Sequence, residues 1–250
     1  MKKAFTMMEL VFVIVIIGIM AVVSVMYIPR NELQQASDYL IQNLKYTKSL
    51  AQLDDRFYAM TETNPNDTSL TQSEKNKRIT NEKRLVENWK LGLWQLQFHR
   101  AGTNAKNSYS IYADQGNSGT TNMFDGIPNN GDLIARDPIN KTCLSGYTLT
   151  NLKECENNFS KEVKLEETYG IVIDSINSVD CTGNANSPFA IHFDNTGTPY
   201  CKAGTIAQSA PTKLTAPITI ILKKGKQTAT ICVSKGGLIY GSNTGICNND

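Results

Sequence analysis

The chain of 250 residues opens with one long apolar stretch and then changes its hydrophobic pattern twice. Residues 10–28 contain no charged side chain. As a helix they would cover about 28 Å, close to the ~30 Å hydrocarbon core of a bilayer. The stretch therefore predicts a membrane-spanning helix with Lys2 and Lys3 on the cytoplasmic side. A cleaved secretory peptide is the alternative, but residues 26–29 (MYIP) stand where such a peptide has a small-x-small cleavage site.

After Pro29 apolar and small residues recur at spacings of three and four, which predicts an amphipathic helix. The recurring residues are Leu33, Ala36, Leu40, Leu44, Thr47, Leu50 and Ala51. Proline lacks a backbone N–H and its ring crowds the preceding turn, so we expect Pro29 to kink the helix rather than end it. A continuous helix from Phe5 to Arg56 would be about 78 Å long, with its first half in lipid and its second half on a globular head.

Short apolar alternations further along the chain predict the strands of a sheet. Trp94, Leu96 and Phe98 share one alternating face, which favours a strand of a half-buried sheet. Other candidate strands lie at 110–113, 168–176, 189–193, 217–222, 227–233 and 237–240, and the turn residues 223–226 (KKGK) predict a hairpin. The polar residues 61–88 and the Gly- and Asn-rich residues 114–142 predict a linker and an irregular insertion. The expected fold is α+β, with the long N-terminal helix packed on an antiparallel sheet.

Glu9 stands one residue before the apolar stretch, inside the segment expected to enter the membrane. An acidic side chain at the centre of a bilayer costs roughly 2.5 to 3.5 kcal/mol and less near its edge, so Glu9 needs a partner or a function. Residues 4–23 (AFTMMELVFVIVIIGIMAVV) resemble the N-terminal signal of type IV pilins and type II secretion pseudopilins. In that signal a small residue and Phe-Thr precede a Glu and an apolar helix.

The resemblance implies processing and assembly. A prepilin peptidase would cut between Ala4 and Phe5 and methylate the new amino group of Phe5. The Glu9 carboxylate would then meet the terminal amine of a neighbouring subunit, which agrees with the need to pair a buried charge. The family usually has Gly where this chain has Ala4, and we expect cleavage after this small residue.

The implied organisation is a leader (1–4), a transmembrane and assembly helix (5–28), its amphipathic continuation (29–60) and an extracytoplasmic β-rich head with irregular insertions (61–250). The implied location is the bacterial inner membrane, crossed once with the N-terminus cytoplasmic and the head periplasmic, and a pilus or pseudopilus after assembly. The implied partners are other pilin or pseudopilin subunits, the prepilin peptidase, an inner-membrane assembly platform, and membrane lipid before assembly.

Three further segments resemble one particular branch of this family. Residues 36–51 (ASDYLIQNLKYTKSLA), 193–200 (FDNTGTPY) and 218–241 (ITIILKKG…ATICVSKGGLIYG) resemble the minor pseudopilin branch that includes the type II secretion protein H and the competence-associated FimT proteins. That branch implies a structural minor subunit. The sequence leaves open whether the machine is a secretion system, a pilus or a competence apparatus, and whether the subunit lies at a tip.

The cysteines all follow the expected membrane helix: Cys143, Cys155, Cys181, Cys201, Cys232 and Cys247. An even number in an oxidising compartment indicates disulfides. Six cysteines allow fifteen connectivities, and pairing of sequence neighbours is the default expectation. Metal binding is the alternative, but no CxxC or His-containing ligand spacing is present, so no metal and no cofactor is expected.

No motif of an enzyme is apparent: the chain has no nucleophile elbow, no phosphate loop and no paired His and Cys motif. His99 and His192 are expected to be ordinary strand residues. The neighbouring carboxylates Asp54 with Asp55 and Glu166 with Glu167 carry no distinctive signal of acid–base catalysis. The sequence thus predicts a non-enzymatic protein.

The whole chain has a formal charge of +2, but residues 195–249 contain six lysines and no acidic residue. Lysines neutralise phosphates without reading bases, so Lys223, Lys224, Lys226 and Lys235 are candidate DNA contacts, and DNA uptake is the alternative function. Lysines also keep exposed strand edges from aggregating, which explains them without DNA. The FimT proteins are thought to bind DNA through an arginine-bearing C-terminal segment, whereas residues 236–250 of this chain lack Arg and Lys. A separate N-x-S pattern marks Asn158 as a possible glycosylation acceptor.

Overall fold

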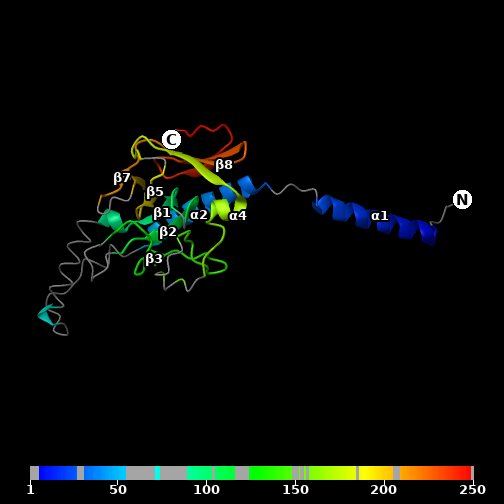
Figure 1. The fold of residues 1–250 in the computed structure, drawn as a ribbon, viewed down its shortest axis with the longest axis horizontal. Helices are drawn as coiled ribbons and strands as arrows, with labels where there is room; N and C mark the ends of the chain where they lie inside the picture. The colour runs from blue at the N-terminus through cyan, green and yellow to red at the C-terminus, as the bar shows by residue number, and fades with distance from the viewer. Residues whose placement is uncertain are drawn as a thin grey trace. The chain divides into compact units, whose positions relative to one another are not determined.

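The computed structural model describes residues 6–26, 31–54, 71–73, 89–102, 105–115, 124–147, 152, 155, 158–183, 186–204 and 209–248. The chain divides into two compact units, Met1–Glu32 and Leu33–Asp250, and each is described by itself. The predicted linker 61–88 lies outside the described residues except for Thr71, Gln72 and Ser73. Figure 1 shows the elements of both units.

The first unit contains helix α1, Met7–Met26. Its described side chains, from Met7 to Met20, are all exposed, and all except Glu9 and Gly18 are large and apolar. Among the described residues no helix is both long and apolar enough to cross a membrane. The predicted membrane-spanning segment and the single-pass inner-membrane location are therefore wrong.

The predicted continuous helix from Phe5 to Arg56 is also wrong. Helix α1 ends at Met26 and helix α2 runs from Glu32 to Leu53, while Asn31 between them is not helical. Residues 27–30, with Pro29, lie outside the described residues. The sequence offers a physical reason for the break, because a proline removes one helical hydrogen bond and disfavours helical geometry in the residue before it. The amphipathic half of the prediction holds, since α2 buries Leu33, Ala36, Leu40, Leu44, Thr47 and Ala51.

A six-stranded antiparallel sheet forms one layer of the second unit, in the order β3-β2-β1-β5-β6-β7. The bounds of its strands are β1 Trp94–His99, β2 Ser108–Ala113, β3 Leu133–Ile134, β5 Phe189–Phe193, β6 Pro199–Ala203 and β7 Thr212–Lys213. A short 3₁₀ helix, η2 (Trp89–Gly92), precedes β1. Strands β1, β2 and β5 were predicted, β6 and β7 were not, and β3 lies inside the stretch predicted to be irregular.

A second antiparallel sheet has the order β10-β9-β8-β4. Its strands are β4 Val172–Asn177, β8 Ile218–Lys224, β9 Gln227–Val233 and β10 Ile239–Ser242. Strands β8 and β9 pair along their whole length, so the predicted hairpin is confirmed. Helix α4, Leu165–Tyr169, ends at Gly170 with a φ of 65°, a left-handed conformation that glycine adopts without strain. Residues 168 and 169 were predicted as strand, and they belong to this helix instead.

The single sheet of the predicted α+β fold is thus replaced by a mostly β unit with two antiparallel sheets. Helix α2 and both sheets share one hydrophobic core, which includes Leu40 and Leu44 of α2, Phe98 of β1 and Ile220 of β8. Figure 1 shows α2 beside strands of this unit. A second sheet forms because the apolar residues of β4, β8 and β9 need a buried face of their own.

Strand β1 is covered on both faces, contrary to the half-buried strand predicted from its alternation. Leu96 and Phe98 are buried on one side, while Gln95, Gln97 and His99 are buried on the other. Gln97 is accommodated because its amide nitrogen donates to the Gly126 carbonyl oxygen at 2.7 Å and its carbonyl accepts from the Tyr112 hydroxyl at 3.1 Å. The polar alternation of β1 therefore marks a hydrogen-bonded interior and not a solvent face.

Candidate assembly site

The start of helix α1 is built by a reciprocal pair of side chains, Thr6 and Glu9. The Thr6 amide and hydroxyl each donate to Glu9 Oε2 at 3.0 Å, and the Glu9 amide donates to Thr6 Oγ1 at 3.3 Å. This arrangement is a capping box, in which two residues three apart satisfy backbone donors that a helix start leaves without partners. This role of Glu9 was not predicted, although a Thr followed three residues later by Glu before an apolar run is the sequence signal of a capping box.

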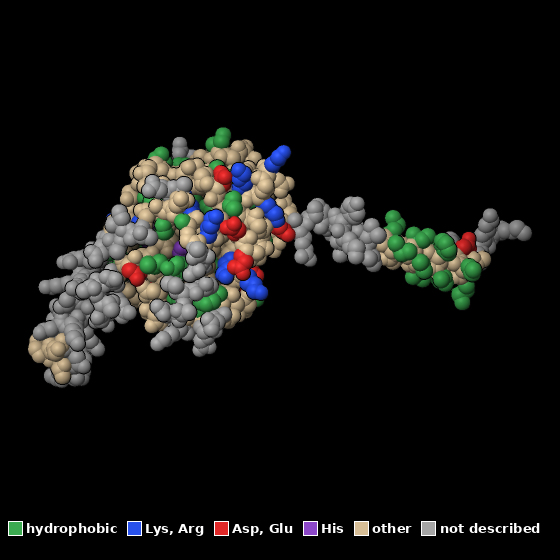
Figure 2. Space-filling view, viewed as in Figure 1, with side chains coloured by type: hydrophobic (Ala, Val, Ile, Leu, Met, Phe, Trp, Pro, Cys, Tyr) green, Lys and Arg blue, Asp and Glu red, His purple; other side chains and the backbone are tan. Residues whose placement is uncertain are grey.

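These hydrogen bonds also set the charge of the carboxylate. Hydrogen bonds from the Thr6 amide, and then from its hydroxyl, hold the pKa of Glu9 below its usual value. A carboxylate at a helix N-terminus is further favoured by the helix dipole. Glu9 is therefore charged at neutral pH and fixed at the first turn of α1, whose other described side chains are almost all apolar and exposed; Figure 2 shows one face of this helix. Ala4 and Phe5, the predicted cleavage and methylation residues, lie outside the described residues.

All six cysteines form disulfides, and they join sequence neighbours: Cys143 with Cys155, Cys181 with Cys201, and Cys232 with Cys247. The Cα atoms of each pair lie 5.5–6.0 Å apart, a usual spacing for a disulfide. This pairing agrees with the default expectation from the sequence. No free cysteine remains.

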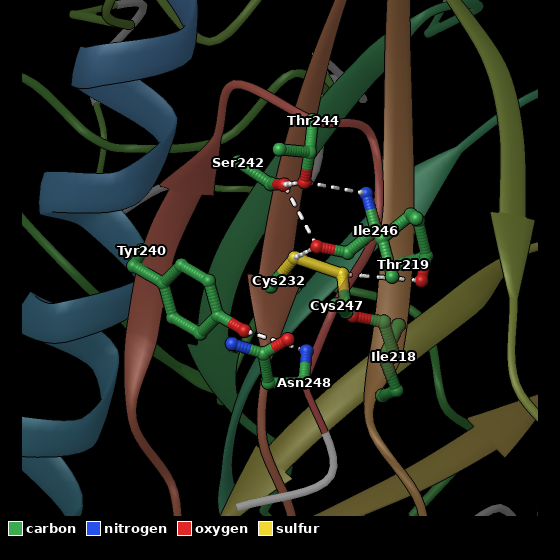
Figure 3. The surroundings of a disulfide bond; sticks show 9 residues. All are labelled: Ile218, Thr219, Cys232, Tyr240, Ser242, Thr244, Ile246, Cys247 and Asn248. Carbon is green, nitrogen blue, oxygen red and sulfur yellow. Dashed lines mark hydrogen bonds between the residues drawn. A yellow bond between two sulfur atoms is a disulfide. The ribbon is translucent and has the colours of Figure 1, made fainter.

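The disulfide Cys232–Cys247 holds the C-terminal segment against the four-stranded sheet (Figure 3). The Ser242 hydroxyl donates to the Ile246 carbonyl oxygen at 2.7 Å, and the Asn248 amide donates to the Tyr240 hydroxyl oxygen at 2.9 Å. Thr219 on β8 contacts Cys247 Sγ at 3.2 Å. Residues 243–248 therefore form an ordered loop, although most of them are exposed.

The structure does not bring the four candidate DNA-contacting lysines together. Lys223, Lys224 and Lys226 lie at the turn between β8 and β9, whereas Lys235 lies in the turn between β9 and β10, at the other end of β9. Seven residues of strand separate these ends by about 23 Å. Lys223 Nζ also lies 3.6 Å from Asp174 Oδ1 on β4.

Acidic and basic side chains are mixed on the face of the head that Figure 2 shows. Glu166 and Glu167 belong to α4, and Glu167 pairs with Lys164 at 2.9 Å. Asp54 follows the end of α2, and Asp55 lies outside the described residues. Glu166 and Glu167 thus line one open pocket together with Lys164, whereas Asp54 lies away from it at the end of α2.

Asn158, the possible glycosylation acceptor, is exposed, and its carbonyl oxygen accepts from the Cys143 amide at 2.8 Å.

The two histidines are strand residues, as predicted, and both are buried. His99 Nε2 lies 2.8 Å from Ser110 Oγ, and burial lowers the pKa of His99 to about 4. His192 lies within β5, where burial, and then the charge of Lys202, lower its pKa to about 3. Both imidazoles are therefore neutral at physiological pH. In the part of the chain that the structure describes, no three His, Cys, Asp or Glu side chains are grouped so that they could hold a metal ion.

Comparison of the chain with protein-family models, with curated proteins and with solved structures finds no match.

Proposed function

We propose that this protein is a structural subunit of a pilin-type filament, a minor pilin or pseudopilin, that is processed between Ala4 and Phe5 and assembles through helix α1. The observation that carries the proposal is the exposure of α1. Every large apolar side chain from Met7 to Met20 is at least 45% exposed. A helix that is apolar on all sides needs a cover of similar character, because exposed apolar area costs roughly 25 cal/mol per Å². In the proposal, the equivalent helices of neighbouring subunits supply that cover.

Glu9 gives the proposed packing its register. The capping box keeps the carboxylate charged and in place at the first turn, and none of the three hydrogen bonds that hold it involves residues 1–4. Removal of the leader would therefore leave the cap intact and create a free amine on Phe5. In a packed array of apolar helices a lone carboxylate is costly, so the amine of a neighbouring subunit stabilises one stagger over the others. Residues 33–250 would then be the displayed head, with three disulfides to hold it.

The test separates the charge of Glu9 from its capping role. Glu9→Gln keeps an oxygen that can accept from Thr6 but removes the charge, whereas Glu9→Ala removes both. We expect both variants to lose incorporation into sheared filaments from the native host to a similar extent, while the head keeps its unfolding midpoint. Glu167→Gln, which neutralises an exposed carboxylate on α4, is the matched control and should assemble normally. Normal assembly of Glu9→Gln would overturn the charge-pairing role.

Intact-mass measurement of the protein from its native host tests processing independently. We expect a chain that begins at Phe5 and carries one added methyl group. A chain that begins at Met1 in filaments would contradict the processing step, and a processed chain that is never found in filaments would contradict assembly.

A further inference from the structure

Two buried carboxyl groups hold the segment Phe124–Asp132, here named the latch segment, and one of them, Asp132, is its last residue. Asp114 directly follows β2, and Asp132 directly precedes β3. Their exposed fractions are only 3% and 2%. Three hydrogen bonds from backbone amides end on them: Gly126 N donates to Asp114 Oδ2 at 2.8 Å, Gln115 N to Asp132 Oδ1 at 2.9 Å, and Asn129 N to Asp132 Oδ2 at 2.8 Å. The bonds from Gly126 to Asp114 and from Gln115 to Asp132 thus fasten the latch segment to the residues that follow β2, and the bond from Asn129 to Asp132 lies within the segment.

The latch segment closes over a polar interior. The Gly126 carbonyl oxygen accepts a hydrogen bond of 2.7 Å from Gln97 on β1. Beneath it lies a cavity of about 10 Å³ whose lining includes Gln97, Asp114, His192 and Lys202. Among the described residues neither ring nitrogen of His192 has a hydrogen-bond partner. Release of the latch segment would therefore expose several polar groups that the closed form hides.

The carboxyl groups of Asp114 and Asp132 are neighbours, because Asp132 accepts its hydrogen bond from the amide of Gln115, the residue that directly follows Asp114. Burial, and then the charge of Asp132, raise the pKa of Asp114, while burial raises the pKa of Asp132. Two carboxylates so close in a poorly solvated site cannot both ionise without a large penalty, and sharing one proton relieves it. A shared proton thus favours the closed arrangement, and loss of that proton opposes it.

Other charged and titratable groups face the pair from the neighbouring elements. Asp125, within the latch segment, adds to the negative charge, and Lys202 on β6 attracts Asp114. His192 on β5 stays neutral because its pKa is lowered to about 3. The buried Tyr112 on β2 stays neutral because burial raises its pKa well above the usual value. Near neutral pH the carboxyl pair is therefore the group that gains or loses a proton.

We propose that Asp114 and Asp132 form a pH-sensitive latch, which holds the segment Phe124–Asp132 closed while they share a proton and loosens it when both ionise. The direction of the pH dependence follows from the raised pKa values of the two carboxyls. The pair stabilises the closed latch segment fully below the unfolded-state Asp pKa near 4, and this stabilisation is lost as the pH rises through their folded-state pKa values. The latch acts within the head and does not depend on how the N-terminal helix assembles.

Amide hydrogen exchange on the full chain tests the latch. Protection factors of Gly126, Asn129 and Gln115, corrected for intrinsic exchange, should fall by roughly tenfold or more between pH 6 and pH 8. Asp114→Asn keeps an oxygen to accept from Gly126 and offers an N–H to Asp132, so it imitates a permanently protonated Asp114. In this variant the protection should stay nearly constant over the same range. Asp174→Asn, an exposed change on the other sheet, should keep the wild-type profile.

Three results would overturn the proposal. The first is wild-type protection that does not change with pH. The second is an Asp114→Asn variant that loses protection with pH as steeply as the wild type. The third is protection at pH 6 that disappears with a chelator and returns with Ca²⁺, because a cation and not a proton would then bridge the carboxyls. If Asp114→Asn fails to fold, carboxyl ¹³C titration of the wild type replaces it, and two independent titrations at ordinary Asp pKa values would equally refute the shared proton.

Discussion

Asn43 of α2 donates a hydrogen bond of 2.7 Å from its side-chain nitrogen to the hydroxyl oxygen of Tyr109 on β2, and both residues are buried. The bond joins the helix to the six-stranded sheet inside the shared core. Asn43→Ala would leave the phenol hydroxyl buried without this partner. We expect the free energy of unfolding to fall by about 1 to 3 kcal/mol, which urea titration of the head's near-UV signal measures.

Gln42→Ala is the matched control for this bond, because Gln42 is the exposed neighbour on the same helix. It should change the free energy of unfolding by less than about 0.5 kcal/mol. Equal effects of the two substitutions would mean that the hydrogen bond contributes nothing beyond the helix propensity of the site.

Gly237, in the turn between β9 and β10, is expected to be intolerant of any side chain. Its φ is +78°, and a Cβ there would lie 2.5 Å from the Gly197 carbonyl oxygen, a backbone atom that cannot rotate away. Gly237→Ala should therefore lower the free energy of unfolding of the head by more than the roughly 1 kcal/mol that a left-handed conformation alone costs a residue with a side chain. Gly245→Ala supplies the comparison, since φ is +74° but the nearest atom is 3.9 Å away. Thermal unfolding midpoints that fall equally in both variants would show that the clash is relieved.

The disulfide Cys232–Cys247 closes a loop with a sequence separation of 15. A loop of this length corresponds to about 3 kcal/mol of lost chain entropy in the unfolded state. The double variant Cys232→Ser with Cys247→Ser should lower the free energy of unfolding by about that amount and increase amide exchange in residues 242–248. Denaturant titration measures the first effect and hydrogen exchange the second. An unchanged denaturant midpoint would show that the hydrogen bonds of Figure 3 suffice to order the loop.

The sequence pattern predicted those elements whose periodicity reflects one buried face. The observed helix α2 and the β8–β9 hairpin agree closely with the spacing of their apolar residues. In each element a shift of register would move the apolar side chains from the core to solvent, so the apolar pattern determines the structure. The neighbour pairing of the six cysteines was the default among fifteen connectivities, and the structure has this pairing. Helix α4 was missed, since five residues carry too little periodicity to be distinguished from a strand.

The buried carboxyls show why the rest could not be predicted. Asp114 and Asp132 are separated by 17 intervening residues rich in Gly and Asn, a composition typical of an exposed loop. Their burial arises from a tertiary relationship, the closure of residues 124–132 over β1 and β5, which leaves no local trace in the sequence. The same closure buries Gln97, so the alternation of β1 wrongly suggested a solvent face. The break before α2 was underestimated because a proline can either kink or end a helix.

Asp180 joins the end of β4 to the segment before β8 and is expected to make the head sensitive to acid. Burial acts to raise its pKa, but hydrogen bonds from the Thr215 hydroxyl and amide and from the Ala216 amide outweigh this and hold the pKa below its usual value. A lowered folded-state pKa contributes stability above the unfolded value of about 3.8, and that stability is lost as pH falls through the folded-state pKa. Asp180→Asn should therefore lower the free energy of unfolding by roughly 1 kcal/mol at neutral pH, a figure that already allows for solvent screening. The difference from the wild type should shrink as the pH falls below about 4. Urea titrations of the wild type and the variant across this pH range measure the difference in the free energy of unfolding. Asp38→Asn, which changes an exposed carboxylate on α2, is the control. A difference that stays constant with pH would mean that the charge of Asp180 plays no part.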